Sequence, residues 1–506
     1  MTAELAGFGA ARVGARRTFA AASDFDILRT VAISAGIGAS ILFVFLGLRF
    51  GLQMYADGSL FSYAVAVQDA WAFHCHNIAG RLTVYFLAFL PAETYVRLTG
   101  DPQGGVALYG FLFFLAQGAG LALTFAADRS RNRIIFAYGC ASTACLCPMV
   151  FGFPTEVWVM HALFWPALAM CHYARRGIAG NVSTFVLLAA LAFTHASALI
   201  AGWAIVVTLA LRDRPNPRFE QIARLGLTVL LLWVIVKANL RPDDYVSAVL
   251  MRAALHVFDL SIFTGPFMLL LTGALAGYLA AFAVFRRLDA ERAHLFALSL
   301  TIAGLAIYWI GFDQALHAAN RYYMRTPVLI AVPVLGMVAG AHTLFADGEL
   351  NPMIPFLPRL LAALTSETAA RMALGAIAVV ISVHVVETTK FIAAWSRYQS
   401  AVAKLAMSDA SDPALGDPRF VSSERISPQL NRLSWMSTTH FLSVLLAPSL
   451  KPARLVVDPS ATYFWLSCET ATESRDARRA APVQARELVR VYSCLHRKRR
   501  LQPARR

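Results

Sequence analysis

The chain has 506 residues with a formal net charge of +15, and 58% of its residues are hydrophobic while only 15% are charged. Soluble domains usually carry about a quarter of charged residues, so this composition excludes an ordinary soluble protein. Much of the positive charge lies in short Arg-rich linkers between apolar runs, and no nucleic-acid recognition motif accompanies it. We therefore expect no nucleic-acid partner. The basic tail from His496 to Arg506 is expected to contact anionic membrane lipids.

Apolar stretches of membrane-spanning length recur between residues 28 and 388. They predict an all-α polytopic membrane protein with about eleven transmembrane helices, oriented by the Arg-rich linkers. The predicted crossings are 28–50, 106–126, 134–151, 157–173, the two halves of 182–211, 224–239, 267–286, 293–311, 327–345 and 371–388. The linkers at 128–133, 175–176, 212–224 and 286–292 should face the cytoplasm together with the N-terminus. This alternation places the C-terminus outside.

The first outer loop is predicted at residues 51–105. Its segment 82–98 carries Pro91, Glu93 and Arg97. Counting this segment as a crossing would move the arginines after residue 128 to the outer side, so we interpret it as an interfacial helix on the outer membrane surface.

The segment 182–211 has cytoplasmic signals at both ends, so it must leave and return as two short helices that turn at Thr194 and His195. Helices that short leave polar backbone inside the bilayer, which is tolerable only beside a protein cavity.

Residues 1–388 are predicted to form the membrane domain and residues 389–506 an extracytoplasmic region. The run at 453–468 has a strand-like pattern, which predicts a small α/β appendage. Cys468 and Cys494 could pair if that region is extracytoplasmic, although one sequence leaves their pairing open. Residues 1–27 lack the compact apolar core of a cleavable signal peptide.

Ionisable residues gather in the predicted outer loops. The set comprises Asp57 and Asp69 in the first loop, Glu156 at 151–156, Asp243, Asp244 and Asp259 at 240–266, and His317, Arg321 and Arg325 at 312–326. Acids and arginines on one side of a helical bundle suit a reaction at the membrane surface.

The order and sidedness of these loops resemble those of GT-C glycosyltransferases, such as protein O-mannosyltransferases and bacterial transferases that use polyprenyl-phosphate sugars. "YADGSLFSY" (55–63) is similar to their first-loop acidic motif, and "GFPTEVWVMHALFWPALAM" (152–170) to their second outer loop. "LAALAFTHASALIAGWAIVV" (188–207) resembles their short helical hairpin, and "ANRYYMRTPVLIAV" (319–332) their later loop. The resemblance spans about residues 28–345. Family members often have a paired acidic motif, whereas here Gly58 follows Asp57.

The resemblance implies a fold and an activity. It implies a GT-C-like bundle that transfers a sugar from a polyprenyl-phosphate donor to a glycan, lipid or protein acceptor with inversion. Asp57 would be the catalytic base, and Arg321 would contact the donor phosphate. The site would face the periplasm from a bacterial inner membrane. A base for the acceptor hydroxyl and an arginine fork for the phosphate agree with the chemistry of this transfer.

Each candidate also has a structural interpretation. Asp57 in Ala-Asp-Gly suits a turn, Glu156 suits a helix N-terminus, and Asp69 suits a solvated face. His195, Arg325 and Tyr322 are further substrate-binding candidates that would equally serve packing or the membrane interface. His74 and His76 would point to different faces of a helix, so we predict no metal site there. A requirement for a divalent metal is left open.

Two other classes of protein remain as alternatives. A transporter or lipid flippase would place charged residues at mid-depth in several spans. A polysaccharide polymerase or ligase would also use lipid-linked sugars, but its long functional loop usually lies late in the chain. The sequence favours the glycosyltransferase hypothesis because the long polar loop is early and the ionisable residues lie at the outer face.

Overall fold

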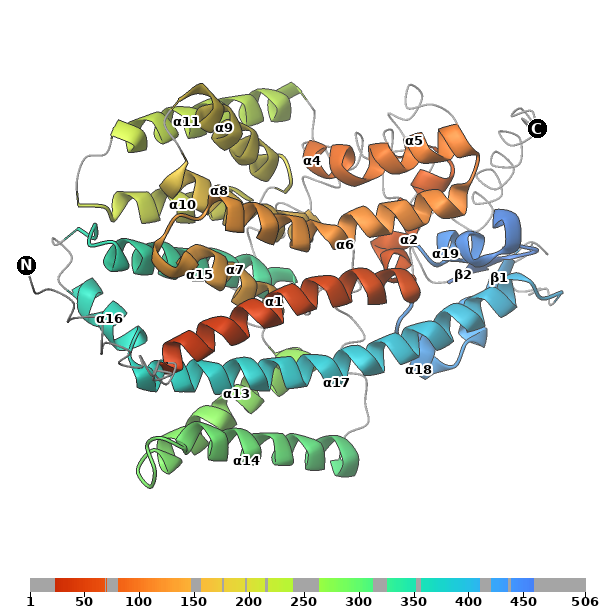
Figure 1. Cartoon of the computed structure of the whole chain (residues 1–506). Helices are drawn as coiled ribbons and strands as arrows, with labels where there is room; N and C mark the ends of the chain where they lie inside the picture. Colours follow the sequence, from red (N-terminus) through yellow and green to blue (C-terminus); the bar gives the residue numbers. More distant parts are fainter. Residues whose placement is uncertain are drawn as a thin grey trace, which may run out of the picture.

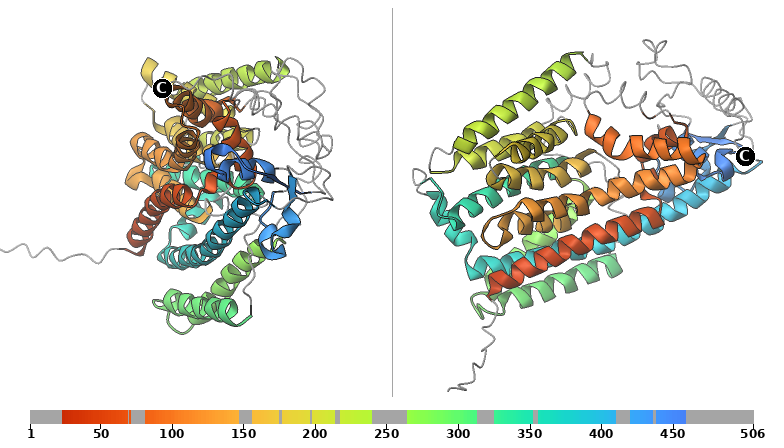
Figure 2. Two further views of the ribbon diagram at one scale, coloured as in Figure 1. Left: turned by 90° about the vertical axis from the view of Figure 1, so that its right-hand side faces the viewer. Right: turned by 45° about the horizontal axis from the view of Figure 1, so that its top comes forward.

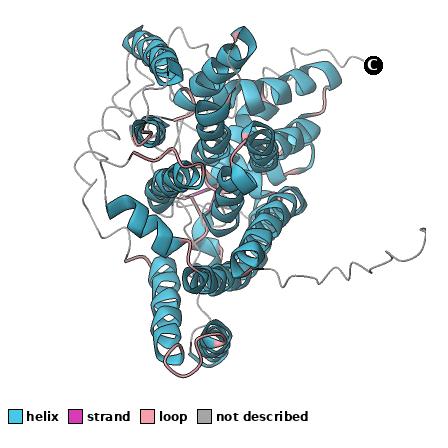
Figure 3. Ribbon diagram, turned by 60° about the vertical axis from the view of Figure 1, so that its left-hand side comes forward, coloured by secondary structure: helices cyan, strands magenta, loops and turns pink. Residues whose placement is uncertain are grey.

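The computed structural model describes residues 23–68, 70, 81–146, 156–174, 177–195, 198–213, 217–239, 264–312, 325–351, 356–409, 420–435 and 438–458. This part of the chain is helical apart from one pair of short strands and the connecting turns (Figures 1 and 3). Seven of its helices are long and apolar enough to cross a membrane. The prediction of an all-α polytopic membrane protein is therefore confirmed.

The main helices follow the apolar stretches of the sequence. Their bounds are α1 Asp24–Arg49, α6 Pro102–Ala127, α7 Ile134–Leu146, α8 Glu156–Tyr173, α9 Ile178–Ala192, α10 Ala198–Ala210, α11 Pro217–Asn239, α13 Pro266–Phe285, α14 Ala293–Ile307, α15 Arg325–Ala346, α16 Phe356–Leu364 and α17 Glu367–Ala406. A π-helical turn, η6 (Tyr308–Phe312), continues α14. Each predicted crossing overlaps one of these helices. The number of crossings stays a prediction, because α7, α8, α9 and α10 are not among the seven spanning candidates.

Most of the long helices run side by side, with α1 packed between α6 and α17 and α14 at the edge (Figure 2). Several Arg-bearing linkers meet at one end of this bundle. Arg371 Nε lies 2.7 Å from Asp24 Oδ2, and its Nη1 donates to the carbonyl oxygen of Ala290 at 3.3 Å. Arg212 Nη2 lies 2.5 Å from Glu349 Oε2 at the same end. This arrangement agrees with linkers on a single side of the membrane, and the cytoplasmic assignment of that side stays a prediction.

Glycines allow the closest helix crossings. A Cβ atom on Gly36 of α1 would lie 2.5 Å from the Cα and the carbonyl oxygen of Cys140 on α7. A Cβ atom on Gly120 of α6 would collide with the carbonyl oxygen of Ala162 on α8. Close backbone approach at small residues is typical of helix packing in membranes, where lipid competes for apolar side chains.

Replacing Gly36 with leucine should therefore separate α1 from α7. We expect the Gly36→Leu variant to lose about 1–3 kcal/mol of stability because its neighbours are backbone atoms that cannot move aside. Gly38→Leu is the matched control, since no atom lies within 4 Å of its Cβ position. Thermal unfolding in detergent measures both variants. Equal melting temperatures for the two leucine variants would contradict this packing.

The helix predicted at 82–98 is observed, but its orientation differs from the prediction. It comprises α4 (Leu82–Val84), the π-helical turn η2 (Tyr85–Phe89) and α5 (Leu90–Thr99). It runs beside the N-terminal half of α6, along the bundle axis rather than across it (Figure 1). Val96 and the Ala92 backbone pack tightly on Gly105 of α6, where there is no room for a side chain. The 82–99 helix is thus part of the bundle.

The C-terminal elements continue from the end of α17. Helix α17 has 40 residues and extends well beyond the predicted crossing at 371–388. Strand β1 (Phe420–Ser422) pairs in parallel with β2 (Leu455–Val457), and α18 (Pro428–Asn431) and α19 (Thr439–Leu446) lie between them in the chain. Strand β2 falls within the run predicted as a strand. A separate α/β appendage and a domain boundary at residue 388 stay predictions, and Cys468 and Cys494 lie outside the described residues.

Candidate functional site

Asp57 lies at the start of a short helix behind a strained turn. The turn η1 (Leu52–Met54) follows α1, and α2 (Asp57–Ala66) begins at Asp57. Between them Ala56 has φ 53° and ψ −129°, a backbone conformation that L-residues rarely adopt. Such strain persists only where the surrounding structure imposes it. The half-buried Asp57 is therefore held by its surroundings and not by local preference.

The C-terminal region supplies part of that restraint. The Thr438 hydroxyl, just before α19, donates to the Ala56 carbonyl oxygen at 3.1 Å. The Ser59 hydroxyl lies 2.9 Å from the same oxygen and 3.2 Å from the Thr438 carbonyl oxygen. Next to them the rings of Tyr63 on α2 and Phe441 on α19 pack with centroids 4.7 Å apart. The turn at Ala56 is thus joined to a segment almost 400 positions away in the sequence.

Helix α17 provides the other support of the turn. Tyr55 packs edge-on against Phe391 and Trp395, with ring centroids 5.0 and 5.3 Å apart. The Trp395 indole donates to the carbonyl oxygen of Phe50 at 3.1 Å, at the end of α1. Tyr55 and Ala56, directly before Asp57, are therefore held by α17 on one side and by the start of α19 on the other.

Replacing Thr438 tests this restraint. Thr438→Val keeps the shape but removes the hydroxyl donor to the Ala56 carbonyl, so we expect a loss of about 1 kcal/mol in stability. The loss should be accompanied by faster amide hydrogen exchange at residues 52–60. Thr438→Ser keeps the donor and is the control. Unchanged exchange in Thr438→Val would show that the turn is held without this bond.

Glu156, the other predicted acid, is paired with an arginine. It begins α8 and is 4% exposed. Arg81, just before α4, places Nη1 2.5 Å from Glu156 Oε1. Arg81 was not predicted as a site residue from the sequence, although it is the basic residue directly before the apolar run at 82–90. A buried carboxylate with a partly buried guanidinium is a far stronger pair than two exposed groups.

The turn between α9 and α10 lies close to the Arg81–Glu156 ion pair. The amide and hydroxyl of Thr83 donate to the carbonyl oxygens of Phe193 and Ala190, at 3.3 and 2.7 Å. His195 follows in the same turn and is 9% exposed. The predicted turn between two short helices is observed, and it brings His195 near the segment that carries Arg81.

A double-mutant cycle on Arg81→Gln and Glu156→Gln should measure the strength of this pair. We expect a coupling energy of roughly 0.5–3 kcal/mol in the free energy of unfolding, because one partner is buried. The exposed pair Arg224–Glu220 has the same 2.5 Å separation and serves as the control. Its coupling should stay below about 0.5 kcal/mol. Equal couplings would mean that the Arg81–Glu156 pair is solvated.

Tyr109 on α6 is a buried polar residue in the region of the two predicted acids. Its side chain is fully buried, and its hydroxyl lies within electrostatic range of both Glu156 and Asp57. Among the described residues this hydroxyl has no hydrogen-bond partner. Tyr109 is therefore a buried polar group whose surroundings include the charges of both acids.

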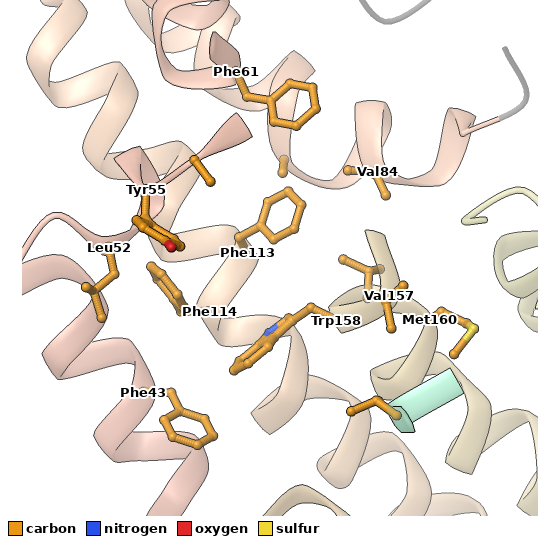
Figure 4. Packing of buried hydrophobic residues seen from close by; sticks show 14 of the residues in the cluster. Phe43, Leu52, Tyr55, Phe61, Val84, Phe113, Phe114, Val157, Trp158 and Met160 are labelled. Atoms are coloured by element: carbon orange, nitrogen blue, oxygen red, sulfur yellow. The ribbon is translucent and has the colours of Figure 1, made fainter. Parts of the chain in front are cut away.

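Aromatic and aliphatic side chains pack around this part of the chain. Figure 4 shows Tyr55, Phe61, Phe113, Val157 and Trp158 gathered in one cluster from the first loop, α6 and α8. Such surroundings exclude water and strengthen electrostatic interactions with the acids.

Glu93 is a buried acid with a structural contact. It lies on α5, is 5% exposed, and accepts a hydrogen bond from the amide of Ala70 at 2.8 Å. Glu93 thus fixes the chain that follows α2.

The remaining predicted site residues are only partly covered by the structure. Asp69, Arg321 and Tyr322 lie outside the described residues. Arg325 begins α15, and the position of its side chain is not described. A phosphate site at these residues stays a prediction. In the described part of the chain, no three His, Cys, Asp or Glu side chains are grouped to hold a metal ion.

No protein-family model matches the chain, and no curated protein matches it. The function therefore has to be argued from the arrangement around Asp57, Glu156 and Tyr109.

Proposed function

We propose that the chain is a GT-C-like glycosyltransferase that moves a sugar from a polyprenyl-phosphate donor to an acceptor at the extracytoplasmic face of the membrane. The main support is the turn at Ala56, whose strained backbone is held by Thr438 directly before Asp57. Strain of this kind clusters at active sites, where it serves to orient a reacting group. A turn needed only to connect α1 to α2 would have no use for it.

Asp57 would be the catalytic base. Its carboxylate takes the proton of the acceptor hydroxyl, whose oxygen attacks the anomeric carbon of the donor sugar. The bond from that carbon to the phosphate oxygen breaks, and polyprenyl phosphate leaves with the electron pair. Attack from the side opposite the phosphate inverts the anomeric centre.

Other groups would stabilise the substrates. Arg321, assisted by Tyr322 and Arg325, is our candidate for the donor phosphate, because a guanidinium binds phosphate with two parallel hydrogen bonds. Glu156, with Arg81 and Tyr109, and His195 in the hairpin turn would orient the acceptor. Asp69 completes the set of candidate contacts in the first loop.

The finer features of the fold belong to the same proposal. We infer about eleven crossings, with the N-terminus in the cytoplasm and the C-terminus outside. Residues 389–506 would form an extracytoplasmic α/β region over the first loop. A bacterial inner membrane with a periplasmic active site would provide the polyprenyl-phosphate donor, and the acceptor would be a glycan, a lipid or a protein.

The Asp57→Asn variant tests the mechanism. Asparagine keeps the size of the side chain but cannot take the acceptor's proton, so turnover should fall about 10²- to 10⁴-fold. Donor binding should be retained. The measurement is release of polyprenyl phosphate from a panel of polyprenyl-phosphate sugars by the reconstituted protein, with cell-envelope extract as the source of acceptor.

Asp101→Asn is the matched control in the same loop. Asp101 caps α6 through the amides of Gln103 and Gly104, and asparagine caps helices equally well. This variant should retain wild-type turnover. Wild-type turnover in Asp57→Asn would refute the mechanism.

A further inference from the structure

A second polar cluster lies on α17, outside the residues discussed so far. Glu387 is 0% exposed, and its Oε1 accepts a hydrogen bond from the Trp309 indole of η6 at 3.0 Å. Lys390 Nζ lies 3.4 Å from the same oxygen and 5.9 Å from the centroid of the Trp309 ring. The carboxylate is therefore held by two donors on one of its two oxygens.

The other oxygen of Glu387 has no such support. In the described part of the chain Oε2 has no hydrogen-bond partner, although the side chain is fully buried. Leaving a buried carboxylate oxygen without a donor is costly, because the oxygen loses its contacts with water. A protein that needed only to join α14 to α17 would be more stable with apolar side chains at these positions. The orphaned oxygen suggests that a ligand donates to it.

The cluster lies close to the first loop along α17. Phe391, one turn further on, packs against Tyr55, two residues before Asp57. His384, one turn earlier, lies 3.0 Å through Nε2 from the carbonyl oxygen of Cys145 near the end of α7. One turn of α17 rises only about 5.4 Å, so Glu387 lies near Tyr55 and the strained backbone at Ala56.

The charges of the cluster indicate which ligand it takes. Glu387 and Lys390 together are neutral, so neither an anion nor a cation gains a net attraction from the pair. A phosphate would meet the carboxylate, and a metal ion would meet the ammonium. A hydroxyl group can donate to Oε2, and a neighbouring hydroxyl can accept from Lys390 Nζ, which has three N–H donors and is a quarter exposed.

We propose that Glu387 and Lys390, braced by Trp309, form a subsite for vicinal hydroxyl groups of a saccharide. This inference rests on the proposed function, because it assigns the subsite to the sugar of the lipid-linked donor. Glu387 was not predicted from the sequence, because a single acid within the apolar stretch 371–388 belongs to no recognisable motif.

Binding measurements on the full-length protein in lipid nanodiscs test the subsite. The probes are undecaprenyl phosphate and undecaprenyl-phosphate mannose, glucose and galactose, with dissociation constants from native mass spectrometry. The wild type should bind at least one sugar-linked lipid more tightly than the bare lipid. Glu387→Gln should reduce that preference about 10- to 100-fold, the effect of losing a hydrogen bond to a charged group, and should leave bare-lipid binding unchanged.

Two further variants keep the test decisive. Glu387→Met with Lys390→Met removes the polar pair while preserving volume, so it should fold and should show the same loss. Glu367→Gln is the control, since Glu367 lies at the opposite end of α17 and its side chain is 72% exposed. Sugar preference equal to the wild type in both Glu387 variants would overturn the subsite.

A second measurement separates the subsite from the proposed function. Free methyl hexosides are titrated while tryptophan emission is recorded, because the Trp309 indole contacts Glu387. Failure of every polyprenyl-phosphate lipid to bind the wild type would refute the proposed function. In that case, a saccharide response that the wild type shows and Glu387→Gln lacks would still support the subsite. If the wild type gave no saccharide response either, the subsite would be overturned together with the proposed function.

Discussion

The strained backbone at Ala56 is the constraint on which the arrangement around Asp57 depends. A residue in such a conformation costs about 1–3 kcal/mol, so contacts from elsewhere have to hold it. The contacts come from α17 through Tyr55 and from the C-terminal region through Thr438. Asp57 follows directly, so its position is set by parts of the chain that meet only when folding is complete. Local structure alone would not place the carboxylate there.

The two ends of the bundle are joined in different ways. The end with the Arg-bearing linkers uses ion pairs such as Arg371–Asp24, whose side chains are 20% and 26% exposed. The end with Asp57 uses aromatic packing and bonds to backbone carbonyls, and its Glu156 is almost completely buried. Partly solvated pairs weaken with salt, whereas buried contacts do not. Contacts at the end that carries the candidate site should therefore be less sensitive to salt, including the Arg81–Glu156 pair, whose carboxylate is buried.

The sequence predicted those features that depend on local pattern. The lengths of the apolar stretches predicted where the helices lie. The Arg-bearing linkers on both sides of 182–211 predicted the hairpin that the structure contains. The orientation of the 82–99 helix was not predictable, because it depends on the fit of Val96 to Gly105. The bond from Thr438 to Ala56 and the pair of Arg81 with Glu156 join distant residues, and neither leaves a local pattern. The roles assigned to Asp57 and Arg321 came from loop order alone and stay predictions.

The unbroken length of α17 fixes how far the turn before Asp57 lies from the start of α1. Between Arg371, bound to the start of α1, and Trp395, bound to its end, the helix rises about 36 Å at 1.5 Å per residue. The hydrocarbon layer is about 30 Å thick, so the stretch between these two attachments is longer than a membrane span requires. One inserted residue would turn everything beyond it by about 100° and break one of the two attachments. The length of α17 therefore fixes the distance between the start of α1 and the turn that precedes Asp57.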